Sequence, residues 1–182
     1  WIAVSVFDVS FGGKEEVPSI AIIPFENKGA KEDEFYVYSI SSELISDVTS
    51  AGIIRVASIK DIEKLEYKTL DNSELSEKLL VRYIAQGTLW KVDSVFQLSM
   101  ELYDTKSSKV LSSESWQKNW DELTTIKDEL ADKILDKLKV DTKTDAPTQA
   151  INTEAYEYYL RANYIYDKRE YERYGYCTRI IQ

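Results

Sequence analysis

The stretch SIAIIPFEN, residues 19–27, decides the fold of this chain. It begins with an apolar run over residues 19–25, which is typical of a strand buried on both faces of a sheet. Pro24 marks the end of that strand, because proline cannot donate a hydrogen bond to a neighbouring strand. We therefore predict that residues 19–25 form the central strand of a sheet. Glu26 and Asn27 then follow at the edge where ligands approach open α/β sheets.

Helix and strand patterns alternate after this strand. Residues 35–51 carry apolar side chains three and four positions apart, which predicts a helix whose regular part is capped by Ser41 or Ser42. Further elements are strands at residues 53–58, 81–92, 94–104 and 110–120, a helical turn at 59–65, and a short helix at 72–80 capped by Asn72 or Ser73. Gly87 lies inside the third strand, where a glycine indicates a bulge, a bend or a close backbone approach.

The order of these elements predicts an α/β fold. Early strand–helix–strand units favour a parallel core, and the later hairpins add antiparallel strands. A helix over residues 121–140 closes the unit. Its apolar stripe consists of Leu123, Ile126, Leu130, Ile134 and Leu138. We expect a mixed β-sheet of about five strands with helices packed on it, over residues 19–140.

A second, helical unit is predicted at the end of the chain. The polar residues 141–150 are typical of a linker, and residues 151–182 after them are rich in tyrosine. One helical stripe in this last segment consists of Ala155, Tyr159, Ala162 and Tyr166. Its small residues predict close contact with a second helix that ends at residues 180–181, and hence a helical hairpin.

The start of the chain, WIAVSVF at residues 1–7, is apolar but much shorter than the roughly twenty residues that span a bilayer. Two interpretations stay open: the outer end of a transmembrane helix that begins upstream of Trp1, or an additional strand or leader. Residues 8–18 mix glycine, proline and charges, and are typical of a linker. The start at Trp1, rather than at a methionine, predicts that the chain is a piece of a longer protein.

The composition excludes several classes of function. The 182 residues include 32 acidic and 23 basic side chains, a net charge of -9, which argues against nucleic acid binding. There is no histidine, so the commonest general base and metal ligand is missing. Cys177 is the only cysteine, which excludes an internal disulfide and a thiolate zinc cluster. We expect no catalytic residue, no metal and no cofactor.

Glu26 is the best-placed carboxylate, because it directly follows the first strand. The loop over residues 26–34 contains one glycine among several carboxylates, and such a loop repels a phosphate group rather than cradling it. We therefore reject catalysis at Glu26. Glu26 and Asn27 remain the place where a small ligand would bind.

Three stretches together resemble the TolB-N-terminal-like domain. They are PSIAIIPFEN at residues 18–27, SISSELISDVTSAGIIRVAS at 39–58 and LLVRYIAQGTLWKVDSVFQLSMELYDTKSSKVL at 79–111. The family pattern has an SIAVLPF strand, a T-E-E-L-like helix start, a G-V-R-Y-V-L-E-G-S strand and an L-x-D-A-x-T-G hairpin. A later segment, NTEAYEYYLRANYIYDKR at residues 152–169, is similar to the opening of the tetratricopeptide repeats that follow this domain in bacterial cyclase-associated, kinase-associated and CadC-like regulators.

The chain departs from the family pattern at two turns. The usual Asp-Gly before the first helix is replaced by Tyr38 and Ser39, so the turn there is expected to differ. The usual Thr-Gly at the hairpin tip is replaced by Lys106 and Ser107, which lack the glycine that eases a positive φ.

The resemblance implies a non-catalytic sensory or protein-interaction module in a membrane-anchored bacterial regulator. Its helical repeats would bind a protein partner, and we predict that Tyr156, Tyr159 and Tyr166 take part. Known members often follow a transmembrane helix, which favours a membrane tether upstream of Trp1 and a periplasmic or other extracytoplasmic location, with a cytoplasmic location as the alternative. The alternative function is a small-molecule sensor with its ligand site at the carboxyl edge of the sheet, near Glu26.

Overall fold

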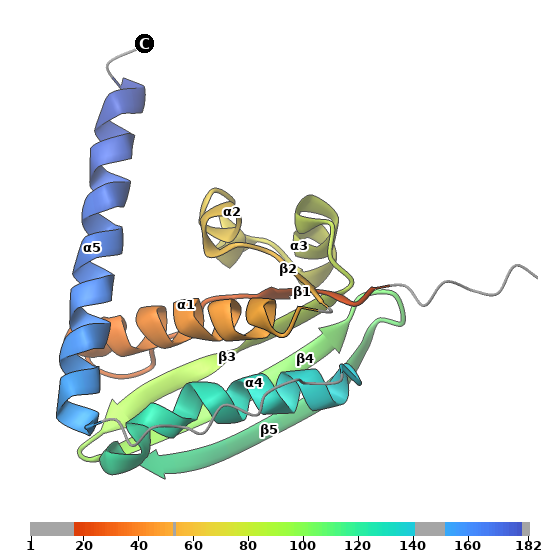
Figure 1. Ribbon diagram of the computed structural model, residues 1–182. Coiled ribbons are helices and arrows are strands. Elements are labelled where there is room, and N and C mark those ends of the chain that lie inside the picture. Colours follow the sequence, from red (N-terminus) through yellow and green to blue (C-terminus); the bar gives the residue numbers. More distant parts are fainter. Residues whose placement is uncertain (1–16, 53, 141–151, 180–182) are drawn as a thin grey trace, which may run out of the picture.

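The computed structural model describes residues 17–52, 54–140 and 152–179 (Figure 1). Within these ranges, five strands form one sheet in the order β2-β1-β3-β4-β5. They are β1 (Ser19–Ile22), β2 (Arg55–Val56), β3 (Tyr83–Val92), β4 (Val95–Asp104) and β5 (Lys109–Asn119). The helices are α1 (Glu34–Ser50), α2 (Ile59–Glu63), α3 (Asn72–Leu79), α4 (Ile126–Lys137) and α5 (Thr153–Arg179). Three 3-10 segments are η1 (Lys31–Asp33), η2 (Tyr67–Thr69) and η3 (Trp120–Thr125).

The sheet is mixed, as predicted. β1 pairs in parallel with β2 and β3, whereas β3, β4 and β5 are antiparallel. The predicted α/β fold with a five-stranded sheet is therefore confirmed. The middle strand is β3, so the prediction that residues 19–25 form the central strand is wrong by one position. β1 is still an interior strand, because it lies between β2 and β3, and its residues Ile20, Ala21 and Ile22 have no exposed surface.

Helices α1 and α4 lie side by side over one face of the sheet (Figure 1). The sheet residues beneath them are apolar, as the alternating sequence of β4 predicts. The buried apolar members of β4 are Phe96, Leu98, Met100 and Leu102. All five residues of the stripe predicted for residues 121–140 are buried as well. The core therefore lies between this face and the two helices.

The backbone beyond β1 continues along β3. The N–H of Ile23 donates to the carbonyl of Ala85 (2.8 Å), and the N–H of Glu26 donates to the carbonyl of Gly87 (3.0 Å). Between them, the ring of Phe25 lies against Gly87. A Cβ atom at Gly87 would lie 2.0 Å from the carbonyl oxygen of Ser99 and 2.9 Å from Cε1 of Phe25. A bulge, a bend and a close backbone approach were the three explanations considered for Gly87. The close approach, here of the β4 backbone at Ser99, is the correct one.

Ser41 joins this segment to α1 and does not cap the helix. Its hydroxyl donates to the carbonyl of Val37 (2.7 Å), and its oxygen accepts from the N–H of Phe25 (3.0 Å). α1 already begins at Glu34, so the predicted cap at Ser41 or Ser42 is wrong. The buried N–H of Phe25 needs an acceptor where proline has ended the strand, and Ser41 supplies it.

The N-terminal cap of α3 is Asp71, one residue before the first of the two predicted positions. The Asp71 carboxylate accepts from the N–H groups of Ser73 and Glu74, both at 2.9 Å, and the Glu74 carboxylate accepts from the N–H of Asp71 at 3.0 Å. This reciprocal capping box needs its first acceptor three positions before the glutamate, which selects Asp71 over Asn72 and Ser73.

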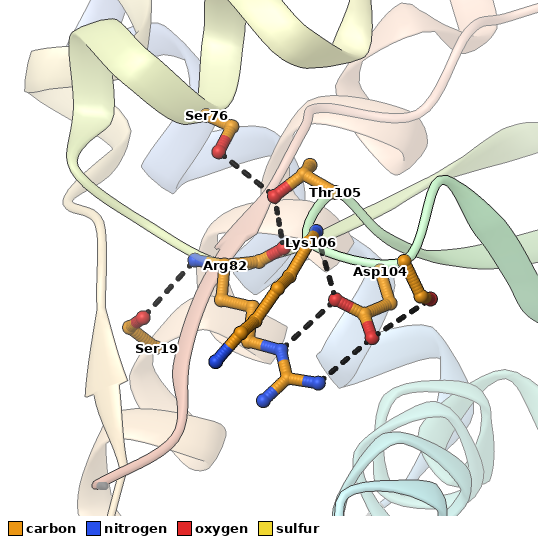
Figure 2. A network of polar contacts seen from close by, with 7 residues as sticks. Ser19, Ser76, Arg82, Asp104, Thr105 and Lys106 are labelled. Atoms are coloured by element: carbon orange, nitrogen blue, oxygen red, sulfur yellow. Dashed lines mark hydrogen bonds and ion pairs between the residues drawn. The ribbon is translucent and has the colours of Figure 1, made fainter.

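An ion pair fixes the edge of the sheet where β3 begins and β4 ends (Figure 2). The Arg82 guanidinium donates to both carboxylate oxygens of Asp104, at 2.9 and 2.8 Å. The N–H of Arg82 also donates to the hydroxyl of Ser19 at the start of β1 (3.0 Å), and the Thr105 hydroxyl contacts that of Ser76 in α3 (3.0 Å). The network thus ties three strands and a helix together.

Asp104 also holds the β4–β5 turn, which lacks the usual glycine. Its carboxylate accepts from the N–H of Lys106 (3.1 Å) and from the hydroxyl of Ser107 (3.0 Å). The positive φ of this turn falls on Ser108, at 53°. Hydrogen bonds from Arg82 hold the pKa of the buried Asp104 carboxyl well below its usual range.

The structure contradicts the hairpin predicted for residues 151–182. α5 is one continuous helix from Thr153 to Arg179. The residues between Tyr166 and Gly175 include neither glycine nor proline, and their Lys, Arg and Glu favour helix. A single Gly175 costs about 1 kcal/mol relative to alanine, which is too little to end a helix.

Three predicted segments lie wholly or largely outside the described residues. They are the leader over residues 1–18, of which residues 17–18 are described, the linker over 141–150, and residues 180–181. Within the described part of the chain, none of the helices combines the length and the apolar character that crossing a membrane requires.

Replacement of Gly87 by alanine should destabilise the domain. The added methyl group must displace the β4 backbone at Ser99 and also the ring of Phe25, so we expect the free energy of unfolding to fall by about 2 kcal/mol or more. Gln86→Ala, on the adjacent position of the same strand, is the control and should change it by less than about 1 kcal/mol. Urea unfolding followed by tryptophan fluorescence measures both. Equal effects would contradict the close approach.

Removal of the Arg82 side chain should also destabilise the domain, because it leaves the buried Asp104 carboxylate unpaired. We expect Arg82→Ala to lower the free energy of unfolding by about 3 kcal/mol at pH 7. Lys64→Ala is the control, since the pair of Lys64 with Asp61 is exposed and its removal should leave the free energy of unfolding nearly unchanged.

The same pair predicts a pH dependence. Because the pKa of Asp104 is lowered by folding, its contribution is complete above the pKa of an unfolded aspartate, about 3.9, and is lost as the pH falls below it. The difference in unfolding free energy between the wild type and Arg82→Ala should therefore shrink between pH 6 and pH 3. A difference that stays constant would show that the carboxylate has an ordinary pKa.

Candidate protein-interaction site

Helix α5 docks on α1 through one of its faces. Tyr156 and Leu160 on this inner face are buried, with 5% and 0% of their surfaces exposed. The Ser39 hydroxyl donates to the carbonyl of Leu160 (2.8 Å). The rings of Tyr38 and Tyr164 meet edge to face, with 5.6 Å between centroids. The two residues that replace the family's usual Asp-Gly therefore lie within α1, not in a turn, and both contact α5.

Two carboxylates add polar contacts to the docked face. The Tyr156 hydroxyl donates to the Glu43 carboxylate, and the Trp120 indole N–H donates to Glu157 (2.9 Å). Burial raises the pKa of Glu43, although the hydrogen bond from Tyr156 and the charge of Lys127 act in the opposite direction. Burial and the neighbouring Glu43 carboxylate raise the pKa of Tyr156 well above its usual range. The tyrosine hydroxyl is thus a fixed donor to a carboxylate in the interface.

The opposite face of α5 is exposed and aromatic. We call it the outer stripe. It consists of Ala155, Tyr158, Tyr159, Ala162, Ile165 and Tyr166, three or four positions apart. Tyr158, Tyr159 and Tyr166 have 66%, 50% and 64% of their surfaces exposed. The C-terminal part of α5 continues past α1 and away from the sheet (Figure 1).

A cleft opens beside the outer stripe, between α1, α4 and α5. Its volume is about 470 Å³. The lining residues are Glu43, Ser46 and Asp47 from α1, Lys127 from α4, and Ala155, Tyr156 and Tyr159 from α5. The Lys127 ammonium group bridges Asp47 (2.6 Å) and Asp128 (2.9 Å). The aromatic stripe and a charged cleft are therefore neighbours on one surface.

The sequence-predicted ligand position at Glu26 and Asn27 is taken up by local contacts. The exposed Glu26 carboxylate pairs with Lys28 (2.6 Å). The Asn27 side chain accepts from the N–H of Gly29 (2.8 Å) and donates to the carbonyl of Ala30 (2.7 Å). These contacts form a turn that leads to α1, and the cleft described above lies elsewhere.

The three predicted contact tyrosines differ in their exposure. Tyr159 and Tyr166 belong to the outer stripe, whereas Tyr156 lies in the docked face with 5% of its surface exposed. Sequence reasoning missed Glu43 and Asp47. Their spacing of four positions in α1 was a signal, because two like charges on one helix face are unfavourable unless a partner lies nearby.

Comparison with solved structures places the domain in a known class of fold. TolB from Acinetobacter baumannii is similar over 68% of this chain and 29% of its own, with a TM-score of 0.51 and 19% sequence identity. The predicted likeness to TolB is thereby confirmed for the fold. PelC from Paraburkholderia phytofirmans and the lipoprotein GNA1162 from Neisseria meningitidis match less well. PelC matches over 68% of this chain and 89% of its own at 20% identity, with a TM-score of 0.46. GNA1162 matches over 56% of this chain and 79% of its own at 15% identity, with a TM-score of 0.45.

Residues 15–136 match the family model of the HilA/YgeH-like transcriptional regulator, second domain, and the chain belongs to this family. The match ends before α5. Putative adenylate cyclase 3 of Rhizobium meliloti (strain 1021) is 23% identical over 124 residues, which are 68% of this chain and 21% of the relative. The chain thus spans about a fifth of the length of that relative. The α/β unit is a regulatory-family domain, and the predicted relation to a cyclase-associated protein is supported.

The two faces of α5 predict opposite effects of tyrosine removal. Tyr156→Ala removes a buried ring and the donor to Glu43, and should lower the free energy of unfolding by about 3 kcal/mol. Tyr158→Ala, two positions away on the outer stripe, should change it by less than about 0.5 kcal/mol. Urea unfolding of both variants measures the difference. If the two substitutions had equal cost, α5 would not be docked as described.

Proposed function

We propose that this domain is a non-catalytic protein-interaction module of a membrane-anchored bacterial regulatory protein, and that the outer stripe of α5 is its contact surface. The observation that carries the proposal is the division of α5 into a docked face and an exposed aromatic face. Tyrosine is enriched in protein interfaces, because its ring excludes water while its hydroxyl still forms hydrogen bonds. A helix fixed from behind presents such rings without a large loss of conformational entropy on binding.

A role in regulation is supported by the family, which is that of a domain in transcriptional regulators. A catalytic role has little support in the residues. The chain has no histidine, and Glu26, its best-placed carboxylate, is exposed and paired with Lys28. Asn27 is engaged in a turn, so the small-molecule site considered near Glu26 has no support from the local geometry.

The membrane tether and the extracytoplasmic location remain part of the proposal. They are motivated by the apolar residues 1–7 and by the resemblance to domains that follow a transmembrane helix. Fractionation of cells that produce the whole protein, with protease added to intact spheroplasts, tests this part. Recovery of a protected, soluble domain would contradict it.

The contact surface can be tested by site-specific photo-crosslinking of the whole protein in its own cells. A photoreactive phenylalanine analogue at Tyr158 should form a discrete adduct with one protein, because this ring is the most exposed tyrosine of the outer stripe. The same analogue at Ser113 is the matched control, since this residue is exposed on β5 and distant from α5.

The proposal predicts the adduct at Tyr158 and none at Ser113. A further analogue at Tyr166 should capture the same protein as Tyr158, because both rings belong to one stripe. Absence of adducts at both tyrosines, or identical adducts at Ser113, would overturn the assignment of this surface.

A further inference from the structure

The cleft beside the outer stripe has an excess of negative charge. The carboxylates of Glu43 and Asp47 line it, and Asp128 lies next to them through its ion pair with Lys127. Among the described residues, Lys127 is the one ammonium group in the lining, and it is already held by two of these three carboxylates. Glu43 accepts from the hydroxyl of Tyr156, which carries no charge to balance it. A cation is therefore the complementary ligand.

One wall of the cleft is aromatic. The rings of Tyr156 and Tyr159 are stacked, with 6.1 Å between centroids and 20° between planes. The face of a tyrosine ring attracts cations, most strongly when the contact excludes water. The domain already uses this contact nearby, because the guanidinium of Arg161 lies 4.1 Å from the ring centroid of Phe35. A planar guanidinium can lie flat on a ring while its in-plane N–H groups donate to a carboxylate as a rigid fork, a geometry that the compact ammonium group does not share.

The cleft is continuous with the outer stripe, because Ala155 and Tyr159 belong to both. The stripe repeats at helical spacing, and Ala155 and Ala162 leave room for another helix to approach closely. A helix lying along the stripe would therefore carry its flanking side chains past the mouth of the cleft. With a volume of about 470 Å³, the cleft lies in the range of small-ligand sites and is large enough for one long side chain.

We propose that this cleft binds the arginine side chain of a helical protein segment that lies along the outer stripe. The guanidinium stacks on Tyr159 and donates to Glu43, while apolar side chains of the segment cover the exposed rings. The inference rests on the proposed function, since it specifies the chemistry of the same partner. Glu43 and the other carboxylates of the cleft favour a cationic side chain, and the outer stripe provides the apolar contact area.

The cleft can be tested without the partner, using N-acetyl-L-arginine methylamide as the probe. Titration into the 182-residue chain, followed by amide resonances in two-dimensional NMR, should shift residues of α1 and α5 around the cleft with a dissociation constant in the millimolar range. N-acetyl-L-citrulline methylamide has the same shape without the charge, and should produce no saturable shift. Equal shifts by both compounds, or none by either, would overturn the arginine site.

Variants locate the binding within the cleft. Glu43→Gln keeps the shape of the acceptor but removes its charge, so the arginine probe should bind about tenfold more weakly, as expected when a charge-assisted hydrogen bond is lost. Glu101→Gln is the control, because this exposed carboxylate lies on β4 away from the cleft. If Glu43→Gln alters the spectrum beyond the cleft, Asp47→Asn provides the second variant with the same expected direction. Unchanged affinity in both would contradict the proposal.

Two further readouts separate the alternatives. A change of the α5 resonances on dilution, with no probe added, would identify a second copy of this chain as the occupant and overturn the arginine segment. In the whole protein, Glu43→Gln should reduce the yield of the Tyr158 adduct by several fold while leaving its identity unchanged. An unchanged yield would reject the arginine contact and leave the interaction surface itself intact. If the protein that carries the analogue but retains Glu43 formed no adduct at all, the surface would be rejected and the cleft would not.

Discussion

Helix α1 is the element on which the rest of the structure depends, because it must satisfy polar groups on both of its sides. Ser41 accepts the N–H of Phe25 and so holds the chain where Pro24 has ended β1. Two residues away in either direction, Ser39 and Glu43 hold the backbone and the side chain of α5. One helix thereby couples the sheet to the C-terminal helix, and an error in its rotation would break both sets of contacts.

This coupling gives α5 its orientation. A long helix with tyrosines on every side has no intrinsic preference for the face it buries. The carbonyl of Leu160, the hydroxyl of Tyr156 and the carboxylate of Glu157 select one face, because each finds a partner on α1 or η3 only in that rotation. The outer stripe is what this selection leaves exposed, so the surface proposed for the partner is a consequence of how the domain is folded.

The sequence predicted the α/β core well, because the core depends on local patterns that repeat. The buried run of β1, the alternation in β4 and the stripe of α4 each follow a period that a sheet or helix imposes. The caps of α1 and α3 were predicted wrongly for another reason. Several serine, asparagine and aspartate residues adjoin each predicted helix start, and the residue that is used depends on distant contacts, as at Ser41, or on reciprocal hydrogen bonds, as at Asp71. The capping box at Asp71 could have been recognised from Glu74 three positions later.

The candidate site was harder to predict, because it is built from three helices. Tyr159 and Tyr166 were found from their helical spacing, but the same spacing could not show that Tyr156 faces inward. The expected second helix was inferred from the small residues of the stripe, although nothing between Tyr166 and Gly175 ends α5. Tyr38 and Ser39 were recognised as departures from the family pattern, and their role became clear only from their contacts with α5.

The most direct test of the account is the order in which the tyrosines of the free chain react with tetranitromethane, mapped by mass spectrometry. Nitration requires access to the ring and proceeds through the phenolate. The account predicts rapid reaction at the exposed Tyr158 and Tyr166, and protection of Tyr156, which is buried and has a raised pKa. Nitration of Tyr156 as fast as that of Tyr158 would contradict the docking of α5 on α1 and, with it, the orientation of the proposed interaction surface.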